Sequence, residues 1–445
     1  MKSLLNFLVI VGMLLSLLGA EAVSADGFSC SSVTDVPVVE CEALVALYNS
    51  TNGAGWTNRT NWLETVTVGN WYGITVESGH VVGIYLGENH LTGTLPAALG
   101  SLSNLRYLNL FNNQLSGSIP PELGSLSNLT DLDLGGNQLS GSIPRELGSL
   151  SNLTYLNLFD NQLSGSIPPE LGSLSNLQYL NLGNNQLSGS IPPELGSLSN
   201  LQYLNLGNNQ LSGSIPPELG SLSNLTFLYL FDNQLSGSIP AALGNLNSLK
   251  HLWLSNNQLS GEVPGTLMNL TSLTELDLDY NRLTVPGDYP NPSNPLHVFL
   301  SQKAANWHLH QAVSQQIAPD SGGTITSRDG AVQVQVPKDA LDDTVTFTFI
   351  PQAQPSQSSG ELAFANQSFQ LIAENSSGSR VRVFNKPLTV TINYNEADLG
   401  GASEDDLRLF YWDEESSAWK DAATTCTPPS IYRRNLEENR FSVDI

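Results

Sequence analysis

Leucine recurs in one fixed frame along the middle of the chain. Residues 81–285 repeat the pattern Leu-x-x-Leu-x-Leu-x-x-Asn-x-Leu every 24 residues. In the unit that begins at Leu105, Leu108 and Leu110 alternate with polar residues, which predicts a short strand with one buried face. A period of about 20 to 50 residues indicates a solenoid, because one coil cannot bury its own leucines and neighbouring coils must stack to do so. We therefore expect nine coils around one continuous core.

An asparagine holds the same position in every unit. It recurs as Asn89, Asn113, Asn137, Asn161, Asn185, Asn209, Asn233, Asn257 and Asn281. Where the chain turns off the strand, backbone groups would lack hydrogen bonds inside an apolar core, and a side-chain amide can supply them coil after coil. We expect this structural role rather than ligand binding. In the return segment, Gly117 suits a close backbone approach and Pro120 suits an extended path.

The segment LSGSIPPELGSLSNL, residues 115–129, resembles the plant-type leucine-rich repeat of receptor kinases, receptor-like proteins and polygalacturonase inhibitors. The resemblance covers residues 81–285. It implies an α/β solenoid, a right-handed leucine-rich-repeat superhelix with a parallel β-sheet on its concave face.

Residues 42–80 resemble the N-terminal cap of the same family, with Trp56, Trp62 and Trp71 covering the first coil, and we expect the cap to span residues 26–80. The cysteines that usually flank the tryptophan of WYGITV are absent here. By resemblance, such caps are typical of bacterial secreted members, so the plant signalling role does not transfer.

The repeats stop after residue 285, where prolines interrupt the pattern and a short helix within residues 296–313 is expected to complete a C-terminal cap and linker, residues 286–317. From residue 318 to 445 apolar residues recur with period two, which predicts an all-β sandwich-like domain with a hairpin turn at Asp329-Gly330. Residues 318–398 resemble the β domain shared by netrin receptors and ankyrins. Because the sequence stops within an expected strand, we expect the natural chain to continue past Ile445.

The N-terminus has the features of an exported protein. Lys2 precedes an apolar run from Leu4 to Leu18, followed by small residues, so residues 1–25 are predicted to be a signal peptide, with a retained membrane anchor as the alternative. An oxidising compartment favours a disulfide between Cys30 and Cys41 over free thiols. Cys426 then has no partner in the sequence, and a missing partner or a free thiol are both open.

Charge narrows the classes of partner. Forty-one Asp and Glu against 17 Lys and Arg give a net charge of −24, which disfavours nucleic acid and anionic membranes because both repel such a surface. Membrane attachment is expected only through a segment missing from the C-terminus, and we expect a secreted or cell-surface monomer. No nucleophile elbow, phosphate loop, catalytic triad frame or metal-ligand spacing is evident in the sequence, so we expect no enzyme and no cofactor.

Side chains between the strand leucines are expected to face solvent and to form columns along the sheet. Aromatic residues mixed with Asn and Asp suit a glycan, with rings on sugar faces and amides on hydroxyls, or a protein partner. A tyrosine ladder that only stabilises its own sheet is the alternative. The candidate ligand-binding residues are Tyr107, Phe111, Tyr155, Phe159, Tyr179, Tyr203, Phe227, Tyr229, Phe231, His251 and Trp253. Tyr229, Phe231 and Trp253 are favoured because they come from two adjacent strands.

Two possible metal sites carry less weight. Glu275, Asp277 and Asp279 gather near the end of the repeats, where a solvated acidic edge is the more common outcome than calcium binding. His308 and His310 lack a framework of Cys or carboxylate ligands. We therefore expect no metal.

Two consecutive coils have the same sequence. Residues 172–195 and 196–219 are identical at all 24 positions. A catalytic site needs distinct residues in distinct roles, whereas identical coils suit length or a surface that acts by its extent. The sequence therefore favours an interaction protein that binds a protein or an extended glycan on the concave face. The alternatives are a structural spacer or adhesion scaffold of the cell envelope, or an inhibitor of a carbohydrate-active hydrolase.

Overall fold

The computed structural model describes residues 28–305, 307–352, 368–382, 384–394, 408–413, 418–425, 429–435 and 440–445. The predicted signal peptide and Cys426 lie outside these residues. The chain divides into two compact units, the first comprising Met1–Ser188 and Glu194–Tyr203 and the second Gly189–Pro193 and Leu204–Ile445. The boundary falls inside the repeats, in the pair of identical coils, and each unit is described separately.

The first unit begins with a cap built on tryptophans. The helix α2 (Val38–Ser50) is tied to η1 (Cys30–Ser32) by the Cys30–Cys41 disulfide, as expected. Short 3-10 turns follow at η2 (Gly53–Gly55) and η3 (Val68–Asn70). Trp56, Trp62 and Trp71 are at most 5% exposed and contact one another with ring centroids 4.8–4.9 Å apart. Burial of these large rings supplies much of the apolar area that stabilises this end of the chain.

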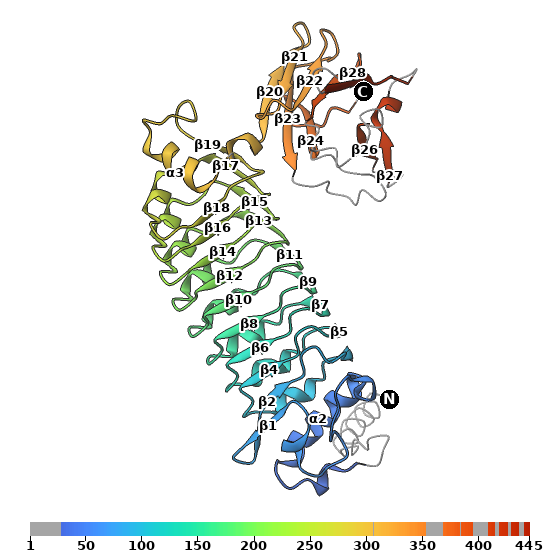
Figure 1. Ribbon diagram of the computed structural model, residues 1–445, viewed down its shortest axis with the longest axis vertical. Coiled ribbons are helices and arrows are strands. Elements are labelled where there is room, and N and C mark those ends of the chain that lie inside the picture. Colours follow the sequence, from blue (N-terminus) through green and yellow to red (C-terminus); the bar gives the residue numbers. More distant parts are fainter. Residues whose placement is uncertain are drawn as a thin grey trace, which may run out of the picture. The chain divides into compact units, whose positions relative to one another are not determined.

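The coils of the first unit repeat a strand, a second strand and a 3-10 helix (Figure 1). The antiparallel pair β1 (Ile74–Glu77) and β2 (His80–Tyr85) starts a sheet that continues with parallel strands. These are β4 (Tyr107–Asn109), β6 (Asp131–Asp133), β8 (Tyr155–Asn157) and β10 (Tyr179–Asn181). The second sheet contains β3 (Thr92–Thr94), β5 (Gln114–Gly117), β7 (Gln138–Ser142), β9 (Gln162–Gly165) and β11 (Gln186–Gly189). The 3-10 helices are η4 (Ala97–Ser101), η5 (Pro121–Ser125), η6 (Arg145–Ser149), η7 (Pro169–Ser173) and η8 (Pro193–Ser197).

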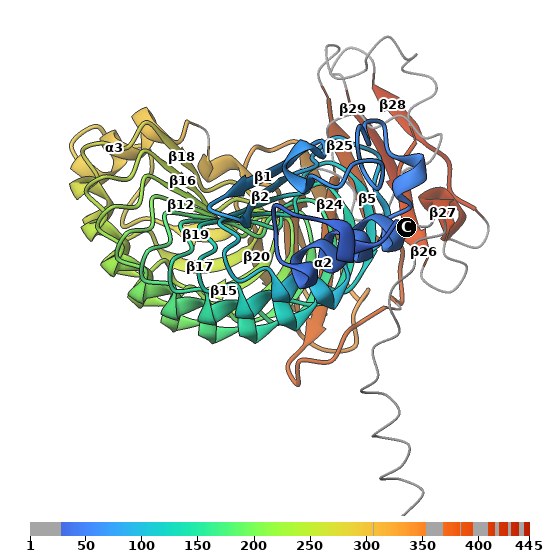
Figure 2. The ribbon, with the colours of Figure 1, turned by 90° about the horizontal axis from the view of Figure 1, so that it is seen from below.

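The coils of the second unit have the same order of elements. The strand β12 (Tyr203–Asn205) crosses the boundary and is followed by β14 (Phe227–Tyr229), β16 (His251–Trp253) and β18 (Glu275–Asp277). The other sheet contains β13 (Gln210–Ser214), β15 (Gln234–Gly237), β17 (Gln258–Glu262) and β19 (Arg282–Thr284). The helices η9 (Pro217–Ser221), η10 (Ala241–Asn245) and η11 (Gly265–Asn269) line up in a row along one side of the coils (Figure 2).

The repeated leucines form the core, as predicted. Leu105, Leu108 and Leu110 are at most 1% exposed, and the same holds for their counterparts in most other coils. The return segment packs tightly, because a Cβ built on Gly124 would lie 2.4 Å from the carbonyl oxygen of Glu146 in the next coil. Gly117 has a φ of 74°, a conformation that glycine adopts without steric cost. The expected α/β solenoid is confirmed, with 3-10 helices in its coils.

The repeated asparagines form hydrogen bonds with backbone groups of their own coil and of the neighbouring coil. The Asn113 amide nitrogen donates to the carbonyl oxygens of Leu86 and Leu110, at 2.8 and 3.0 Å. Its side-chain oxygen accepts from the backbone N–H groups of Asn89 and Leu91, at 3.0 and 2.9 Å. These groups would otherwise be unpaired in an apolar interior. The predicted structural role of the asparagines is confirmed.

The repeats of the second unit end in a cap made of two helical elements. The helix α3 (Pro295–Lys303) and η12 (Trp307–His310) follow the last coil. Gln311, which is fully buried, takes the place of the next asparagine. Its side-chain oxygen accepts from the N–H of Leu283 at 2.9 Å, and its amide donates to the carbonyl oxygen of Leu278 at 3.0 Å. A longer amide side chain thus closes the hydrogen-bond ladder where the 24-residue frame stops.

The remainder of the second unit is antiparallel and rich in β-strands, as expected. One sheet has the order β20 (Val313–Ile317), β23 (Val345–Gln352), β24 (Ser368–Asn375). Another sheet has the order β21 (Gly323–Thr326), β22 (Val332–Val336), β25 (Thr389–Asn393), β29 (Arg440–Asp444), β28 (Arg433–Asn435). A two-stranded sheet pairs β26 (Phe410–Asp413) with β27 (Ala418–Asp421), and η15 (Ala422–Thr425) follows it. Val334, Phe347 and Val390 belong to one apolar core that draws on both larger sheets. The predicted Asp329-Gly330 turn joins β21 to β22.

Candidate functional site

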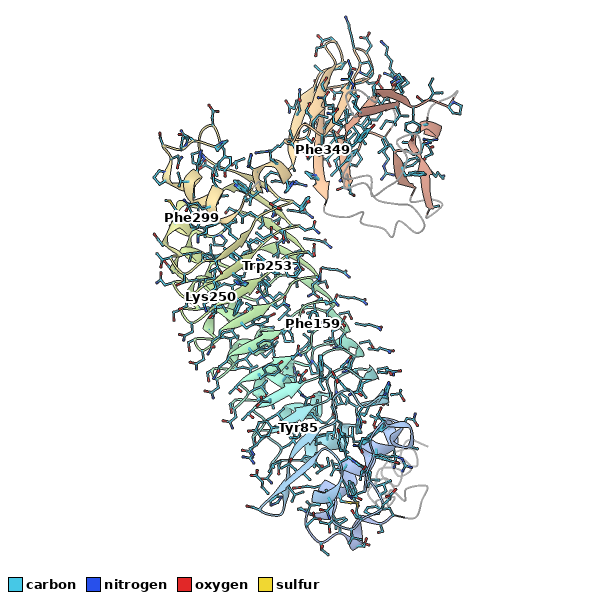
Figure 3. The ribbon with its side chains drawn as sticks, viewed as in Figure 1. Tyr85, Phe159, Lys250, Trp253, Phe299 and Phe349 are labelled. Atoms are coloured by element: carbon cyan, nitrogen blue, oxygen red, sulfur yellow. A yellow bond between two sulfur atoms is a disulfide. The ribbon has the colours of Figure 1, made fainter. Side chains whose placement is uncertain are left out.

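The strands of the long sheet present one buried and two outward side chains each. In β8, β14 and β16 the middle residues, Leu156, Leu228 and Leu252, are fully buried. We call the opposite, outward side of these strands the sheet face. The predicted columns lie on it: Phe111 is 37% exposed, and the other ten candidate residues are partly exposed. Figure 3 labels Tyr85 at the end of β2, Phe159 just after β8 and Trp253 at the end of β16.

In the first unit the tyrosines stack on one another. The rings of Tyr155 and Tyr179 have centroids 4.4 Å apart and planes 11° apart, and Tyr179 and Tyr203 repeat this arrangement at 4.4 Å and 10°. Burial, with a smaller contribution from the negative charge of Asp133, raises the pKa of the Tyr155 phenol. Flat stacking uses ring faces that a ligand would otherwise contact. These residues form the self-stabilising ladder that the sequence left open as an alternative.

The amide column between the tyrosines is largely occupied by the fold. Asn157, Asn181 and Asn205 are only 6–7% exposed. Each side-chain oxygen accepts the backbone N–H two residues later, at 3.2, 3.2 and 2.9 Å. The sequence suggests that these amides could bind the hydroxyl groups of a glycan, as one of two kinds of ligand. In these three residues the side-chain oxygen instead closes a turn with its own backbone, which short Asn side chains often do.

In the second unit, the same columns carry a mixed group of rings, Phe227, Tyr229, Phe231, His251 and Trp253, which we call the aromatic cluster. The strands pair in register, with Tyr229 opposite Trp253. The rings of Tyr229 and Trp253 have centroids 4.5 Å apart at 39°, and the Phe231 ring lies 5.6 Å from Trp253 at 66°. The rings therefore meet at varied angles rather than in a flat stack, and each stays partly exposed.

Polar groups surround the aromatic cluster on its acidic side. The Tyr229 hydroxyl lies 2.9 Å from Nδ1 of His251, and a Glu275 carboxylate oxygen lies 3.5 Å from the same nitrogen. Burial raises the pKa of the Tyr229 phenol, and the charge of Glu275 adds to this effect. The hydroxyl of Tyr229 is thus neutral at physiological pH and fixes the position of the imidazole.

Gly207 is a member of the site that sequence analysis missed. A Cβ built on Gly207 would lie 2.6 Å from a carbon of the Phe231 ring, so the absence of a side chain gives this ring its place. The signal was present in the sequence only as a glycine one coil before Phe231 in the same column.

The end of the sheet face is acidic. The Ser255 hydroxyl donates to Asp277 at 2.5 Å, and the Asp279 N–H donates to the same carboxylate at 3.2 Å. Burial raises the pKa of Asp277 despite these hydrogen bonds. His310 Nδ1 lies 3.0 Å from Asp279, and this hydrogen bond raises the pKa of the imidazole. Among the residues described, no group of three or more His, Cys, Asp or Glu side chains is arranged to hold a metal ion.

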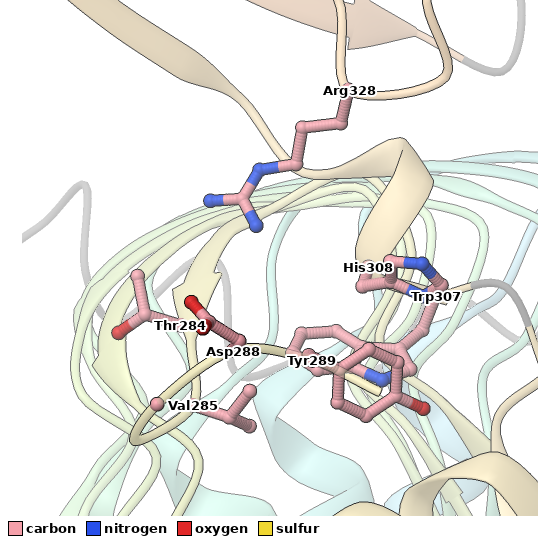
Figure 4. A pocket seen from close by; sticks show the side chains of 8 residues that line it. Thr284, Val285, Asp288, Tyr289, Trp307, His308 and Arg328 are labelled. Atoms are coloured by element: carbon pink, nitrogen blue, oxygen red, sulfur yellow. The ribbon is translucent and has the colours of Figure 1, made fainter. Parts of the chain in front are cut away.

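A pocket of about 290 Å³ next to the C-terminal cap includes none of the predicted site residues. Arg328 approaches it from the β21–β22 turn, and Asp288 and Tyr289 lie across from it (Figure 4). Burial lowers the pKa of Arg328 and of His308, the latter also through the charge of Arg328.

Three leucine-rich-repeat families match parts of the chain. The family described as leucine-rich repeat region matches residues 160–288, the family of two-copy leucine-rich repeats matches residues 103–147, and a single leucine-rich repeat matches residues 149–167. These matches end at residue 288, so the resemblance of residues 318–398 to a netrin-receptor and ankyrin domain stays a prediction. No curated protein matches the chain. Among the residues described, no helix is long and apolar enough to cross a bilayer.

Several of the solved structures that resemble part of this chain are plant proteins. The plant peptide hormone receptor RGFR1 in complex with RGF2 is 44% identical over 45% of this chain and 32% of its own, with a TM-score of 0.45. The ectodomain of the Arabidopsis thaliana receptor kinase GASSHO1/SCHENGEN3, solved with CASPARIAN STRIP INTEGRITY FACTOR 2, is 36% identical over 55% of this chain and 33% of its own, with a TM-score of 0.48. A plant ice-binding protein is 28% identical over 56% of this chain and 81% of its own, with a TM-score of 0.49.

This chain spans about a third of the length of the two receptor structures. The family matches, the parallel strands and the asparagine ladder agree on one architecture. The chain is a leucine-rich-repeat protein.

Proposed function

We propose that this chain is a secreted or cell-surface recognition protein that binds a protein or an extended glycan through the aromatic cluster. It acts by binding rather than by catalysis. The cluster is the part of the sheet face where the repeated pattern gives way to distinct side chains, as a specific contact requires.

One observation carries this proposal: Tyr229, Phe231 and Trp253 meet at varied angles on two adjacent coils and remain partly exposed. Aromatic anchors of this kind dominate the energy of many interfaces, because they remove much apolar surface from water and keep a polar handle. Export to an oxidising compartment is supported by the Cys30–Cys41 disulfide and by the apolar N-terminal run.

The test is a comparison of two triple variants. We would screen the mature chain against panels of extracellular proteins and glycans. Binding would then be measured for the variant with Tyr229→Ala, Phe231→Ala and Trp253→Ala, and for a matched variant with Tyr107→Ala, Phe111→Ala and Tyr155→Ala. We expect the first variant to lose affinity by about 30-fold or more, and the second to keep it within about threefold.

Circular dichroism and thermal melting show whether each variant stays folded. A folded cluster variant that keeps full affinity contradicts the proposal. So does the reverse pattern, in which the matched variant loses binding and the cluster variant does not.

A spacer role is the second candidate, and it is favoured by one observation in the first unit. The stacked tyrosines and buried asparagines give those coils a surface that is committed to its own stability. Deleting residues 172–195, which the next 24 residues duplicate, tests this role. A spacer shortened by one coil should still fold and should still bind any partner of the aromatic cluster. Loss of that binding would mean that the deleted coil belongs to the binding surface.

A further inference from the structure

The same local hydrogen bond between a side chain and the backbone recurs on the sheet face of most coils. A side-chain oxygen accepts the backbone N–H of the residue two positions later, as from Asn109 to Phe111 at 3.2 Å and from Asp133 to Gly135 at 3.1 Å. The same bond forms at Asn157, Asn181, Asn205 and Asp277. The acceptor stands on the sheet face, so the N–H at this position points toward that face.

Two adjacent coils lack this acceptor because Tyr229 and Trp253 occupy its position. Neither ring offers a short oxygen that can reach the backbone two residues later. Within the described part of the chain, the N–H groups of Phe231 and Ser255 have no hydrogen-bond acceptor. The Ser255 hydroxyl is directed elsewhere, to Asp277 at 2.5 Å. The exchange of Asn for a ring therefore adds an aromatic contact and frees a main-chain donor at the same place.

The two donors lie side by side. The register that pairs Tyr229 with Trp253 brings Phe231 next to Ser255, at the usual strand spacing of about 4.8 Å. Because successive coils repeat the same backbone direction, the two N–H groups run parallel, and each can donate to an acceptor of its own.

The surroundings favour a neutral acceptor. Glu275 and Asp277 lie on the next strand, and the chain carries a net charge of −24, so a carboxylate or phosphate would be repelled. The same carboxylates accept hydrogen bonds from hydroxyl groups. The rings of Tyr229 and Trp253 offer apolar surface beside the donors.

We propose that the N–H of Ser255 donates to the acetamido oxygen of an N-acetylated sugar, that the N–H of Phe231 donates to another oxygen of the same ligand, and that the sugar ring packs against Trp253. This inference rests on the proposed function and names the ligand class of the same site. An acetamido group places a neutral oxygen on a short arm beside a ring with an apolar face and hydroxyls. An extended peptide is less suitable, because its carbonyls on one side recur at about 6.8 Å and its main chain would have to enter between the rings.

The test uses two probes that differ in one group. The β-1,4-linked tetramer of N-acetylglucosamine and the β-1,4-linked tetramer of glucose would be titrated into the mature chain by isothermal calorimetry. We expect the acetylated tetramer to bind at least about tenfold more tightly, because the second probe lacks the acetamido oxygen that accepts the Ser255 N–H. Equal binding of the two, or binding of neither, overturns the inference.

Variants separate the donors from the rings. Trp253→Ala removes the ring and leaves the Ser255 N–H free, whereas Trp253→Asn removes the ring and restores the acceptor found in neighbouring coils. We expect Trp253→Asn to bind the acetylated tetramer a further 2- to 10-fold more weakly, roughly the value of one hydrogen bond. Tyr85→Asn, the same change of ring to amide in the same column of the first unit, is the control and should leave affinity unchanged. Equal losses in Trp253→Ala and Trp253→Asn contradict a role for the N–H.

The two proposals can fail separately. If a protein partner binds and the triple alanine variant abolishes that binding, while the acetylated tetramer does not bind, recognition by the aromatic cluster stands and the acetamido inference is overturned. If the acetylated tetramer binds with the same affinity to the triple alanine variant, the sugar binds elsewhere and the acetamido inference is overturned. Recognition by the aromatic cluster is overturned when a folded triple alanine variant keeps full affinity for the partners found in the panels.

Discussion

The tyrosine ladder of the first unit and the aromatic cluster of the second lie on the same face of the same repeat, yet their chemistry differs. In the cluster, Tyr229 and Trp253 occupy the column that holds asparagines in the preceding coils. Tyr155, Tyr179 and Tyr203 stack nearly flat at 4.4 Å. Tyr229 and Trp253 meet at 39°, with a third ring edge-on. Coils with the same side chain in a column place like rings against each other, so the rings stack. Coils with different side chains leave the rings at an angle and leave backbone N–H groups without the usual acceptor. Both the position in the repeat and the identity of the next coil therefore decide what a ring does.

The largest predicted effect is a loss of stability that should be similar in both regions, because both have the same asparagine hydrogen bonds in their core. Asn113→Ala removes the acceptor of two buried N–H groups, and Asn257→Ala removes the partner of the buried Leu235 N–H and of three carbonyl oxygens. Each change should lower the free energy of unfolding by roughly 3 kcal/mol. Denaturant unfolding measures this, and a large loss in only one region would show that the ladder is not equivalent along the chain.

Loss of a single ring should separate stability from binding. Tyr179→Ala removes two stacked contacts, so we expect the free energy of unfolding to fall by about 1 to 3 kcal/mol while affinity for a partner of the aromatic cluster stays the same. Trp253→Ala should do the opposite and weaken binding about tenfold or more, with a smaller loss of stability. Thermal melting and calorimetry on both variants test this, and equal effects on binding would erase the distinction between the regions.

Adding a methyl group at Gly207 tests whether the position of the Phe231 ring matters for binding. Because the Phe231 ring occupies the place of that methyl, Gly207→Ala should displace the ring and weaken partner binding about three- to tenfold without unfolding the chain. Gly183, at the same place in the preceding identical coil, provides the matched variant Gly183→Ala. If both changes reduce binding equally, the ring of Phe231 is not the reason.

The smallest effect concerns the acidic end of the sheet face. Burial raises the pKa of Asp277, so the folded state holds its proton more tightly than the unfolded chain. The wild type should therefore lose stability relative to Asp277→Asn as the pH rises from below 3.8 through the raised pKa. At pH 7 the Asn variant, which keeps the side-chain oxygen found in other coils, should be more stable by no more than about 1 kcal/mol. Melting curves between pH 3 and pH 7 test the sign; a variant that is less stable throughout contradicts it.

The fold could be predicted from the sequence because the same leucine and asparagine positions recur in every coil. The leucine frame predicted the coils, the asparagines predicted their own hydrogen bonds, and Cys30 with Cys41 predicted the disulfide. The sequence was less informative about the site. Tyr179 precedes the buried leucine of its strand and Tyr229 follows the corresponding leucine, but neither position reveals whether the ring stacks flat or at an angle. The amide of Asn181 gives no sign that its oxygen is used by the backbone.

Gln311 shows the same limit at the end of the repeats. It lies outside the 24-residue frame, so its role depends on where the cap returns the chain to Leu283. The place of the Phe231 ring over Gly207 likewise joins two coils that sequence patterns treat one at a time.

The sequence by itself determined which residues are buried and how the coils follow one another, because a period of 24 residues with fixed leucines allows only one way to remove them from water. Only the tertiary structure decided what each outward side chain does. Stacking angle, turn closure and a free N–H depend on atoms from the adjacent coil at distances of a few ångströms. That information resides in the contact between coils and not in either coil alone.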